Sequence, residues 1–270
     1  MTDEPVAYFD AASSTYDDIR FMWEPARRLI VKAKIATGQK VLDVACGTGW
    51  ATMAAARATG DTGRITGIDI SPKMLDVAKE KAISAGLSNI EYRRGDAEAL
   101  EFEDAAFDRV ICASSIFFLQ DITRAIREWR RVLKTGGVIA FTSFGERFLQ
   151  PVLKPLGERL SRYDGQPPPV PSFIDRTDTS DKCRELLKLG GFTDKDIDVT
   201  TEELGFFLPD LTAYWQEISL TFVRSRLFRL NAVDLERFKA EHLSEMESMR
   251  TTKGFWLEFP THFSIGTKRP

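Results

Sequence analysis

The chain has 270 residues, of which 37 are Lys or Arg and 40 are Asp or Glu, so its formal charge is −3. Apolar residues make up 43% and charged residues 29%, which is typical of a soluble globular protein, and the length favours one large domain. The near-neutral charge gives no general attraction to phosphate backbones and disfavours nucleic-acid binding. Three cysteines without a CxxC pair and only two histidines argue against a disulfide framework or a metal site.

The sequence also lacks the signals of membrane insertion and secretion. It has no run of eighteen apolar residues, and its start, MTDEPVAYFD, lacks the charged and apolar regions of a signal peptide. We therefore expect a soluble cytoplasmic protein.

The first half of the chain alternates short β-branched runs with helical patterns, which is typical of a parallel sheet covered by helices. Strands are predicted at residues 40–43, 64–69, 90–94, 107–113 and 138–143. Helices are predicted at residues 51–59, 72–85 and 122–134. We expect Ser71 and Asp121 to cap the second and third helices, and Gly136 to end the third in a left-handed conformation.

After residue 144 the pattern is less regular. Residues 145–162 have helical spacing, and the proline-rich residues 165–171 must form a loop. A helix at 178–189, a sixth strand at 196–201 and two helices within 210–250, broken near Asn231, are predicted next. Residues 255–268 have strand character, with Pro260 as a bulge or edge position. One α/β domain with helical insertions fits these patterns better than two domains.

The most informative stretch is VLDVACGTGW, residues 41–50. An apolar strand ends in Asp43, and Gly47 and Gly49 then turn the chain into a helix whose N-terminal N–H groups can face a ligand. Asp69 ends the next strand, where a carboxylate can accept hydrogen bonds from both hydroxyls of a ribose. These two elements predict a nucleoside-containing ligand at the carboxyl edge of a parallel sheet.

The same loop indicates which nucleoside is bound. Thr52 stands where a dinucleotide fingerprint has its third glycine, and the GK[ST] of a P-loop is absent. Asp43 would place a negative charge beside a pyrophosphate, but it suits a ligand with a positive ammonium group. S-adenosylmethionine carries a ribose, an adenine and an amino-acid tail without phosphate, so it is the expected cofactor, with S-adenosylhomocysteine as product.

Four segments in order carry a resemblance to a known family: VLDVACGTG, GIDIS, GDAEALEFEDAAFDRVICASSIFFLQD and WRRVLKTGGVI. Together they resemble the class I S-adenosylmethionine-dependent methyltransferases, closest to the branch that contains ubiquinone and menaquinone C-methyltransferases and many natural-product enzymes. The similarity runs from about Tyr8 to Phe144 and resumes at residues 186–192. It implies an α/β, Rossmann-like sheet of seven mostly parallel strands flanked by helices, with an antiparallel final strand.

On this resemblance, residues 1–270 form a single methyltransferase domain. Residues 1–39 would be N-terminal helices that cover the cofactor, and residues 40–144 the cofactor-binding core. Residues 145–177 and 205–252 would be helical insertions that form a lid over the acceptor side, and residues 255–268 the last strand.

The resemblance also implies roles for individual residues at the cofactor. The backbone of residues 47–49 would pass under the methionine tail, with Asp43 near the sulfonium and amino group. Asp69 would hold the ribose hydroxyls, Ile70 would pack against the adenine, and Asp96 and the next backbone N–H would bind the adenine edge.

Other residues would enclose the same ligand. Ala113 and Ser114 would line the space between cofactor and acceptor, and either Tyr8 or Tyr16 would lie over the methionine portion. The predicted cofactor-binding residues are Tyr8, Tyr16, Asp43, Ala45, Gly47, Gly49, Asp69, Ile70, Met74, Asp96, Ala97, Ala113 and Ser114.

The acceptor side departs from the family pattern. Many relatives have one or two histidines where this chain has Phe117 and Phe118, which argues against a histidine base there and makes the acceptor side more apolar. Because 13 of the 19 phenylalanines follow residue 140, the insertions are expected to build an aromatic pocket. The predicted acceptor-pocket residues are Phe117, Phe118, Phe144, Phe148, Phe207 and Trp215, with Phe173, Phe206, Phe222 and Trp256 as further candidates.

Some of these aromatic side chains also have a simpler interpretation, as residues that pack in a core. Leu211, Trp215, Ile218 and Phe222 recur at helical spacing, which first indicates a stripe that packs in a core. The cations that follow it, at positions 224, 226 and 229, allow weak contact with a membrane surface as a secondary possibility. The basic run RAIREWRR, residues 124–131, is interpreted as a solvated helix face, with its arginines exposed.

The sequence predicts methyl transfer from S-adenosylmethionine to a small, hydrophobic or aromatic acceptor, such as a quinol, phenol or polyketide, by in-line displacement. Glu146, Tyr163, Asp164 and His242 are bases by type, but no spacing singles one out, so no catalytic residue is assigned. The alternatives are an RNA or protein methyltransferase, or a cofactor-binding relative with non-methyl chemistry or no catalysis. No metal is expected, and the protein is expected to be a monomer or homodimer.

Overall fold

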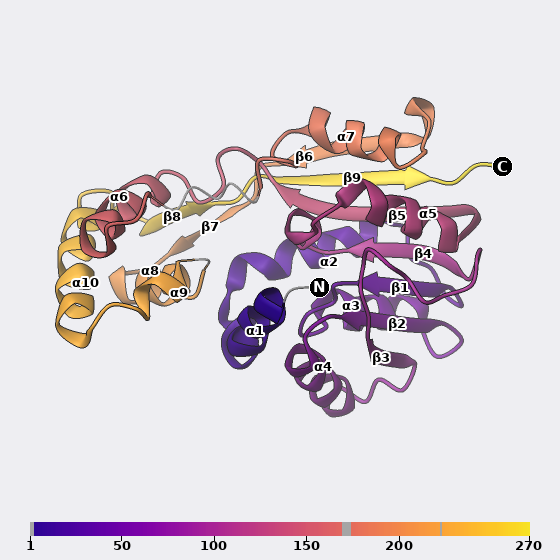
Figure 1. The fold of residues 1–270 in the computed structure, drawn as a ribbon, viewed down its shortest axis with the longest axis horizontal. Helices are drawn as coiled ribbons and strands as arrows, with labels where there is room; N and C mark the ends of the chain where they lie inside the picture. Colours follow the sequence, from indigo (N-terminus) through magenta and orange to yellow (C-terminus); the bar gives the residue numbers. More distant parts are fainter. Residues whose placement is uncertain (1–2, 169–173, 222) are drawn as a thin grey trace.

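The computed structural model describes residues 3–168, 174–221 and 223–270, and a seven-stranded sheet crosses it in the order β3-β2-β1-β4-β5-β9-β6 (Figure 1). Its strands are β1 (Lys40–Val44), β2 (Arg64–Asp69), β3 (Ile90–Arg94), β4 (Phe107–Cys112), β5 (Leu133–Phe144), β6 (Ile197–Glu202) and β9 (Thr261–Thr267). Neighbours from β3 to β5 are parallel, whereas β9 is antiparallel to both β5 and β6. The α/β fold with a seven-stranded, mostly parallel sheet is thereby confirmed.

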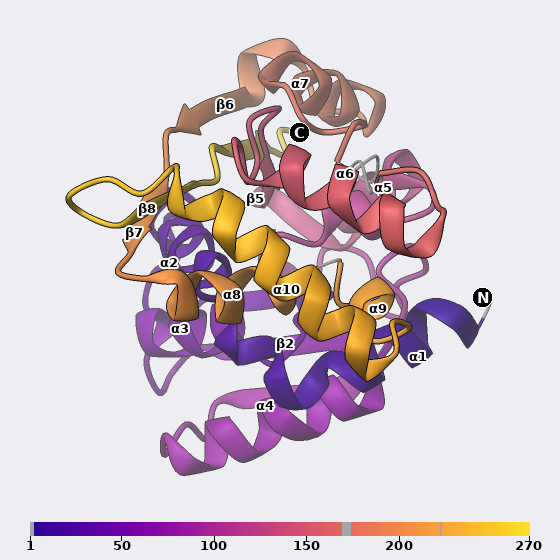
Figure 2. The same ribbon diagram turned by 90° about the vertical axis from the view of Figure 1, so that its left-hand side faces the viewer.

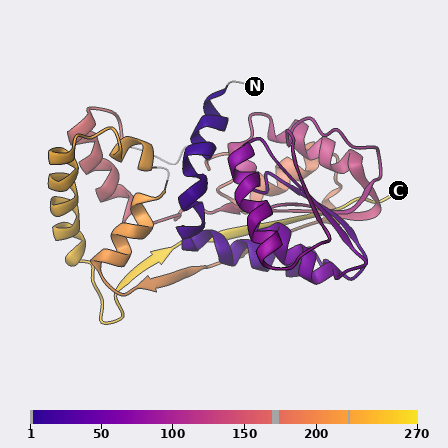
Figure 3. The same cartoon turned by 90° about the horizontal axis from the view of Figure 1, so that it is seen from below.

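Helices cover both faces of this sheet. The pair α2 (Trp23–Lys32) and α3 (Trp50–Thr59) lies on one face, and α5 (Ile122–Val132) and α7 (Ser180–Leu189) lie on the other (Figure 3). The start of α4 (Pro72–Ser84) follows the predicted signal, since the Ser71 hydroxyl accepts a hydrogen bond from the Met74 N–H at 3.1 Å. Asp121 caps α5 in the same way, accepting from the Arg124 N–H at 2.9 Å.

The segments that follow β5 and β6 in the chain together form a separate helical unit. It consists of α6 (Leu153–Asp164), α8 (Leu211–Ser219), α9 (Arg224–Leu227), α10 (Ala232–Glu247) and the two-stranded sheet of β7 (Gly205–Leu208) and β8 (Phe255–Glu258). Figure 2 shows α10 lying across this unit, in contact with α6 and α8. Its own core contains the fully buried side chains of Tyr214, Phe238, His242 and Met246.

An N-terminal segment lies between the helical unit and the sheet (Figures 1 and 3). It comprises α1 (Asp3–Ala12) and the short 3₁₀ helices η1 (Ser13–Asp18) and η2 (Arg20–Met22). This segment therefore faces both parts of the molecule. No helix among the described residues is long and apolar enough to cross a membrane.

Three predicted elements are wrong in detail. Residues 255–268 form two strands in two different sheets, because Pro260 has no N–H for a ladder and separates β8 from β9. Gly136 has a φ of 81° as predicted, but it lies within β5 rather than after a helix, and its N–H donates to the Lys268 carbonyl. Residues 210–250 hold three helices, of which Asn231 caps the last.

Candidate functional site

A cavity of about 650 Å³ opens at the carboxyl ends of β1, β2 and β3, where the N-terminal segment crosses them. We call it the glycine-loop cavity. The predicted residues that line it are Tyr8, Tyr16, Ala45, Gly47, Asp69, Ile70, Met74, Asp96 and Ala97. Because consecutive parallel strands end at one edge of a sheet, segments far apart in sequence meet here.

Asp69 organises the loop after β1. Its two carboxylate oxygens accept hydrogen bonds from the Gly47 N–H at 2.8 Å and the Ser71 N–H at 2.9 Å. Gly47 has a left-handed φ of 53°, and a Cβ there would lie 3.8 Å from the Tyr16 ring. Burial raises the pKa of Asp69, while the backbone N–H groups oppose that shift. The loop is therefore fixed by the same carboxylate that faces the cavity.

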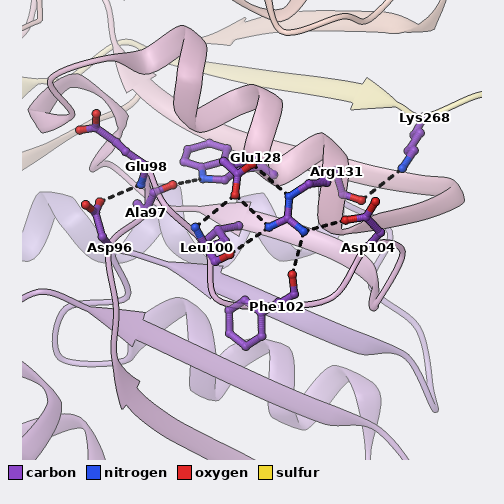
Figure 4. Close-up of polar contacts among 10 residues, drawn as sticks. Asp96, Ala97, Glu98, Leu100, Phe102, Asp104, Glu128, Arg131 and Lys268 are labelled. Carbon is purple, nitrogen blue, oxygen red and sulfur yellow. Dashed lines mark hydrogen bonds and ion pairs between the residues drawn. The ribbon is translucent and has the colours of Figure 1, made fainter.

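The loop after β3 supplies Asp96 and Ala97, and α5 holds it in place (Figure 4). Asp96 accepts a hydrogen bond from the Glu98 N–H at 2.8 Å, and the buried Trp129 indole donates to the Ala97 carbonyl at 2.8 Å. Arg131 donates to the Leu100 and Phe102 carbonyls at 2.9 and 2.7 Å. The same guanidinium pairs with Asp104 and Glu128.

Arg131 thus supports the loop that borders the cavity, although it does not line the cavity itself. The prediction of a solvated helix face is wrong for this residue, because its side chain is only 30% exposed and is bound along that loop. Its carbonyl partners lie about thirty residues away in sequence, so no local pattern identifies them.

Asp43 lies behind the glycine loop, in a small space of about 30 Å³ that it lines together with Ala113 and Ser114. Its carboxyl group is fully buried, and Thr52 donates a hydrogen bond to Oδ2 at 2.5 Å. Among the described residues, the other oxygen, Oδ1, has no hydrogen-bond partner. Burial raises the pKa of Asp43 to about 7, with the Asp69 charge adding to the rise. An unpartnered buried carboxylate oxygen suits a cationic ligand.

Gly49 is the one predicted cofactor residue that lines neither space. It has a φ of 86° and caps α3, and a Cβ there would lie 2.5 Å from the Tyr92 hydroxyl. Its lack of a side chain thus permits close packing between the start of α3 and β3.

A third space of about 60 Å³ adjoins the glycine-loop cavity, and Tyr8, Phe9, Tyr16 and Phe118 line both. We call it the aromatic chamber. It is lined by Tyr8, Phe9, Ala12, Tyr16, Ile19, Phe21, Met22, Phe117, Phe118, Phe144, Phe148, Leu220, Thr221 and Arg224. The rings of Phe144 and Phe148 stack at 4.3 Å, and Phe21 meets Phe148 edge-on at 5.4 Å. Four of the predicted acceptor-pocket phenylalanines therefore converge.

The other two predicted acceptor residues lie elsewhere. Phe207 on β7 packs against Trp256 on β8 at 4.9 Å, and Trp215 on α8 packs against Phe238 within the helical unit. The stripe on α8 is used for packing, because an isolated helical unit needs its own core. Phe206 contacts Phe259 at 5.6 Å, and Phe173 and Phe222 lie outside the described residues.

None of the four residues considered as bases lines any of the three spaces. Glu146 is exposed, and Asp164 pairs with Arg226 at 2.6 Å. His242 is buried in the helical unit, with Nε2 2.9 Å from the Tyr214 hydroxyl, and burial lowers its pKa to about 4. Because Arg226 points inward to Asp164, it is also unavailable for the membrane contact that was considered.

Known proteins give an independent comparison. Residues 41–137 match a family described as a methyltransferase domain. The chain is 39% identical over 155 residues to the aklanonic acid methyltransferase DauC of Streptomyces sp. strain C5, which covers 55% of this chain and 70% of that protein. It is 42% identical over 113 residues to the demethylmenaquinone methyltransferase of Staphylococcus aureus strain MRSA252, covering 42% of this chain and only 46% of that relative. The solved structure of the YcgJ protein from Bacillus subtilis aligns with a TM-score of 0.61 at 20% identity, over 91% of this chain and 98% of that one.

Proposed function

The chain belongs to the family of S-adenosylmethionine-dependent methyltransferases, and from that premise we propose that it methylates a small, hydrophobic or aromatic acceptor. Two relatives are named for small-molecule acceptors, aklanonic acid and demethylmenaquinone. The observation that carries the proposal is the aromatic chamber, which adjoins the glycine-loop cavity and shares four wall residues with it. A chamber of about 60 Å³ holds only part of such an acceptor, and its apolar, ring-lined wall suits the flat part of an organic molecule that extends into the glycine-loop cavity.

We assign the glycine-loop cavity to the cofactor. Asp69 would accept from the ribose hydroxyls, since each of its oxygens has a further lone pair beyond the loop N–H that it accepts. Asp96 and the Ala97 backbone would bind the adenine edge, and Ile70 and Met74 would pack against the ring. The volume of about 650 Å³ lies within the ordinary range for a ligand of this size.

The surroundings of Asp43 support the assignment of this site to the cofactor. Its unpartnered Oδ1 is buried beside the loop, where the amino group of the methionine tail would supply the missing donors and positive charge. Ala113 and Ser114, which line the same space, would then border the route from cofactor to acceptor. Tyr16 lines all three spaces and would separate the methionine tail from the chamber.

S-adenosylmethionine, when bound, supplies a methyl group on a positively charged sulfur and leaves as S-adenosylhomocysteine. An electron pair of the acceptor, either a lone pair or the π pair of an enol carbon, forms the new bond to the methyl carbon, and the carbon–sulfur bonding pair stays on sulfur. Any proton that the acceptor atom must lose reaches solvent when the product is released. The protein's part is to hold the acceptor in line and exclude water, which the closely packed rings of Phe117, Phe144 and Phe148 would do.

The test is to incubate the purified protein with methyl-labelled S-adenosylmethionine and an extract of its source cells. We expect label in the organic-soluble small-molecule fraction, where mass spectrometry identifies the acceptor. Label in RNA or protein would replace the proposal with a macromolecular substrate. Cofactor binding by calorimetry with no label transfer to any fraction would favour a relative that has lost methyl transfer.

A further inference from the structure

The aromatic chamber has a cation in its wall. Arg224, at the start of α9, lines the chamber, and its guanidinium donates a hydrogen bond to the Thr15 hydroxyl at 2.5 Å. The guanidinium carbon lies 5.2 Å from the centre of the Phe228 ring. Within the described residues, Arg224 alone among those lining the chamber carries a formal charge, and it forms no ion pair.

The other inward-facing arginines of the helical unit are neutralised. Arg226, two residues further along α9, is 9% exposed and meets both Asp164 oxygens, at 2.6 and 2.7 Å. Arg159 pairs with Glu241 and Glu245. A guanidinium has five N–H donors, and among the described residues Arg224 uses one of them, for Thr15, so its other donors have no charged partner there.

We propose that Arg224 binds an acidic group of the acceptor, so that the substrate is a flat, apolar molecule bearing a carboxylate or a comparably acidic oxygen. This deepens the function proposed above and rests on it. A guanidinium binds a carboxylate through two parallel N–H donors, and among aromatic rings that contact is stronger than in water. Since Arg224 lines the chamber and neither space at the glycine loop, the group that it holds is the anchor of the acceptor rather than the methylated atom.

Tyr8 lies where this cation and the cofactor cavity meet, since it lines both the chamber and the glycine-loop cavity. Burial raises the pKa of the Tyr8 phenol, and the positive charge of Arg224 acts in the opposite direction. The phenol therefore stays protonated at neutral pH and is a hydrogen-bond donor in the wall that Arg224 faces. A neutral or cationic acceptor would leave the guanidinium without a counter-charge.

The experiment uses two fluorescent probes of similar shape with S-adenosylhomocysteine present: anionic 8-anilinonaphthalene-1-sulfonate and neutral N-phenyl-1-naphthylamine. Both are titrated into the full chain and into Arg224→Met, Arg224→Lys and a matched control, Arg229→Met. Arg229 lies on the same unit but is exposed, and its guanidinium donates to the Ser225 carbonyl. Leu220 lines the chamber, so Leu220→Trp should fill it and thereby test whether the probes bind there.

We expect Arg224→Met to weaken binding of the anionic probe at least tenfold and to change the affinity for the neutral probe less than twofold. Arg224→Lys should restore part of the lost affinity for the anionic probe, and Arg229→Met should change the affinity for neither probe. Leu220→Trp should abolish binding of both probes. The proposal is overturned if Arg224→Met affects both probes equally or neither, if neither probe binds, or if the anionic probe still binds Leu220→Trp. Failure of S-adenosylhomocysteine itself to bind in calorimetry would instead refute the proposed function, and thermal unfolding checks that each variant folds.

Discussion

At the scale of single residues, we expect Asp43 to link ligand binding to protonation. Burial raises its pKa to about 7, so both the protonated and the ionised carboxyl group occur near neutral pH in the ligand-free protein. A cationic tail beside the unpartnered Oδ1 would favour the ionised form. We therefore predict that S-adenosylmethionine binding releases about half a proton at pH 7 and tightens between pH 6 and 8. Calorimetry in two buffers of different ionisation enthalpy measures this release.

Asp43→Asn is the matched variant, because it keeps the size of the side chain and an acceptor for Thr52. It should abolish the proton release and weaken binding by roughly tenfold to a hundredfold. Stability gives a second readout. Because burial raises the pKa from 3.8 to about 7, the stabilisation present below about pH 4 is lost as pH rises from about 4 to about 7. The Tm of the variant relative to the wild type should therefore rise between pH 4 and pH 8, and equal proton release in both proteins would contradict the assignment.

At the scale of elements, the loop after β3 depends on α5. Arg131 ties the Leu100 and Phe102 carbonyls to this helix, and Trp129 ties the Ala97 carbonyl (Figure 4). We predict that Arg131→Met lowers the free energy of unfolding by about 1–3 kcal/mol, because two loop carbonyls and two carboxylates lose a charged partner. It should also reduce the preference for S-adenosylhomocysteine over its inosine analogue, since the residues that we propose for the adenine edge belong to this loop.

Arg127→Met is the control for that experiment. Arg127 lies on the same helix, is exposed, and donates only to the Leu189 carbonyl among the described residues. Chemical denaturation and calorimetry should show little change in this variant. An unchanged adenine preference in Arg131→Met would show that the loop holds its conformation without α5.

At the scale of the whole molecule, carboxylates attach the N-terminal segment to both of its neighbours. Asp17 accepts from the Thr48 hydroxyl at 2.5 Å and the Trp50 indole at 2.8 Å, on the sheet side. On the other side, the buried Glu217 of α8 accepts from the Arg20 and Phe21 N–H groups at 2.8 and 3.3 Å. The N-terminal segment, which lines both the glycine-loop cavity and the aromatic chamber, is thereby attached to the helical unit.

We predict that Glu217→Ala opens this segment. The buried Phe21 N–H and the partly buried Arg20 N–H lose their acceptor, at a cost of about 1–3 kcal/mol for the buried group, so hydrogen exchange in residues 13–22 should accelerate at least tenfold. Glu217→Gln, which keeps an acceptor oxygen, should change exchange much less. Glu247→Ala is the surface control, because Glu247 pairs only with Arg250 among the described residues. Equal exchange in Glu217→Ala and the wild type would rule out this coupling.

Local sequence signals predicted the strands of the central sheet well. They were incomplete where one residue type can serve two different structural roles. The Ser71 and Asp121 caps lie where expected, because a cap needs only the next three residues. Gly136 has the predicted left-handed conformation and Pro260 marks a break, but contacts with distant residues decide what each does: the Gly136 N–H donates to the Lys268 carbonyl from within β5, and Pro260 separates strands of two sheets. Gly49 similarly turned out to serve packing against Tyr92.

Local sequence patterns were enough to predict which residues line the cavity that we propose for the cofactor. Asp43, Gly47, Asp69 and Asp96 each lie at or shortly after the carboxyl end of a strand, and parallel strands bring such positions to one edge of the sheet. The lining of the aromatic chamber, in contrast, emerged only from the folded structure. Phe144 enters the chamber while Phe207 packs on β8, and Arg224 is left unpaired by the described residues while Arg226, on the same helix, meets Asp164. These outcomes depend on contacts between residues that lie about fifty or more positions apart in the sequence, which local periodicity does not encode.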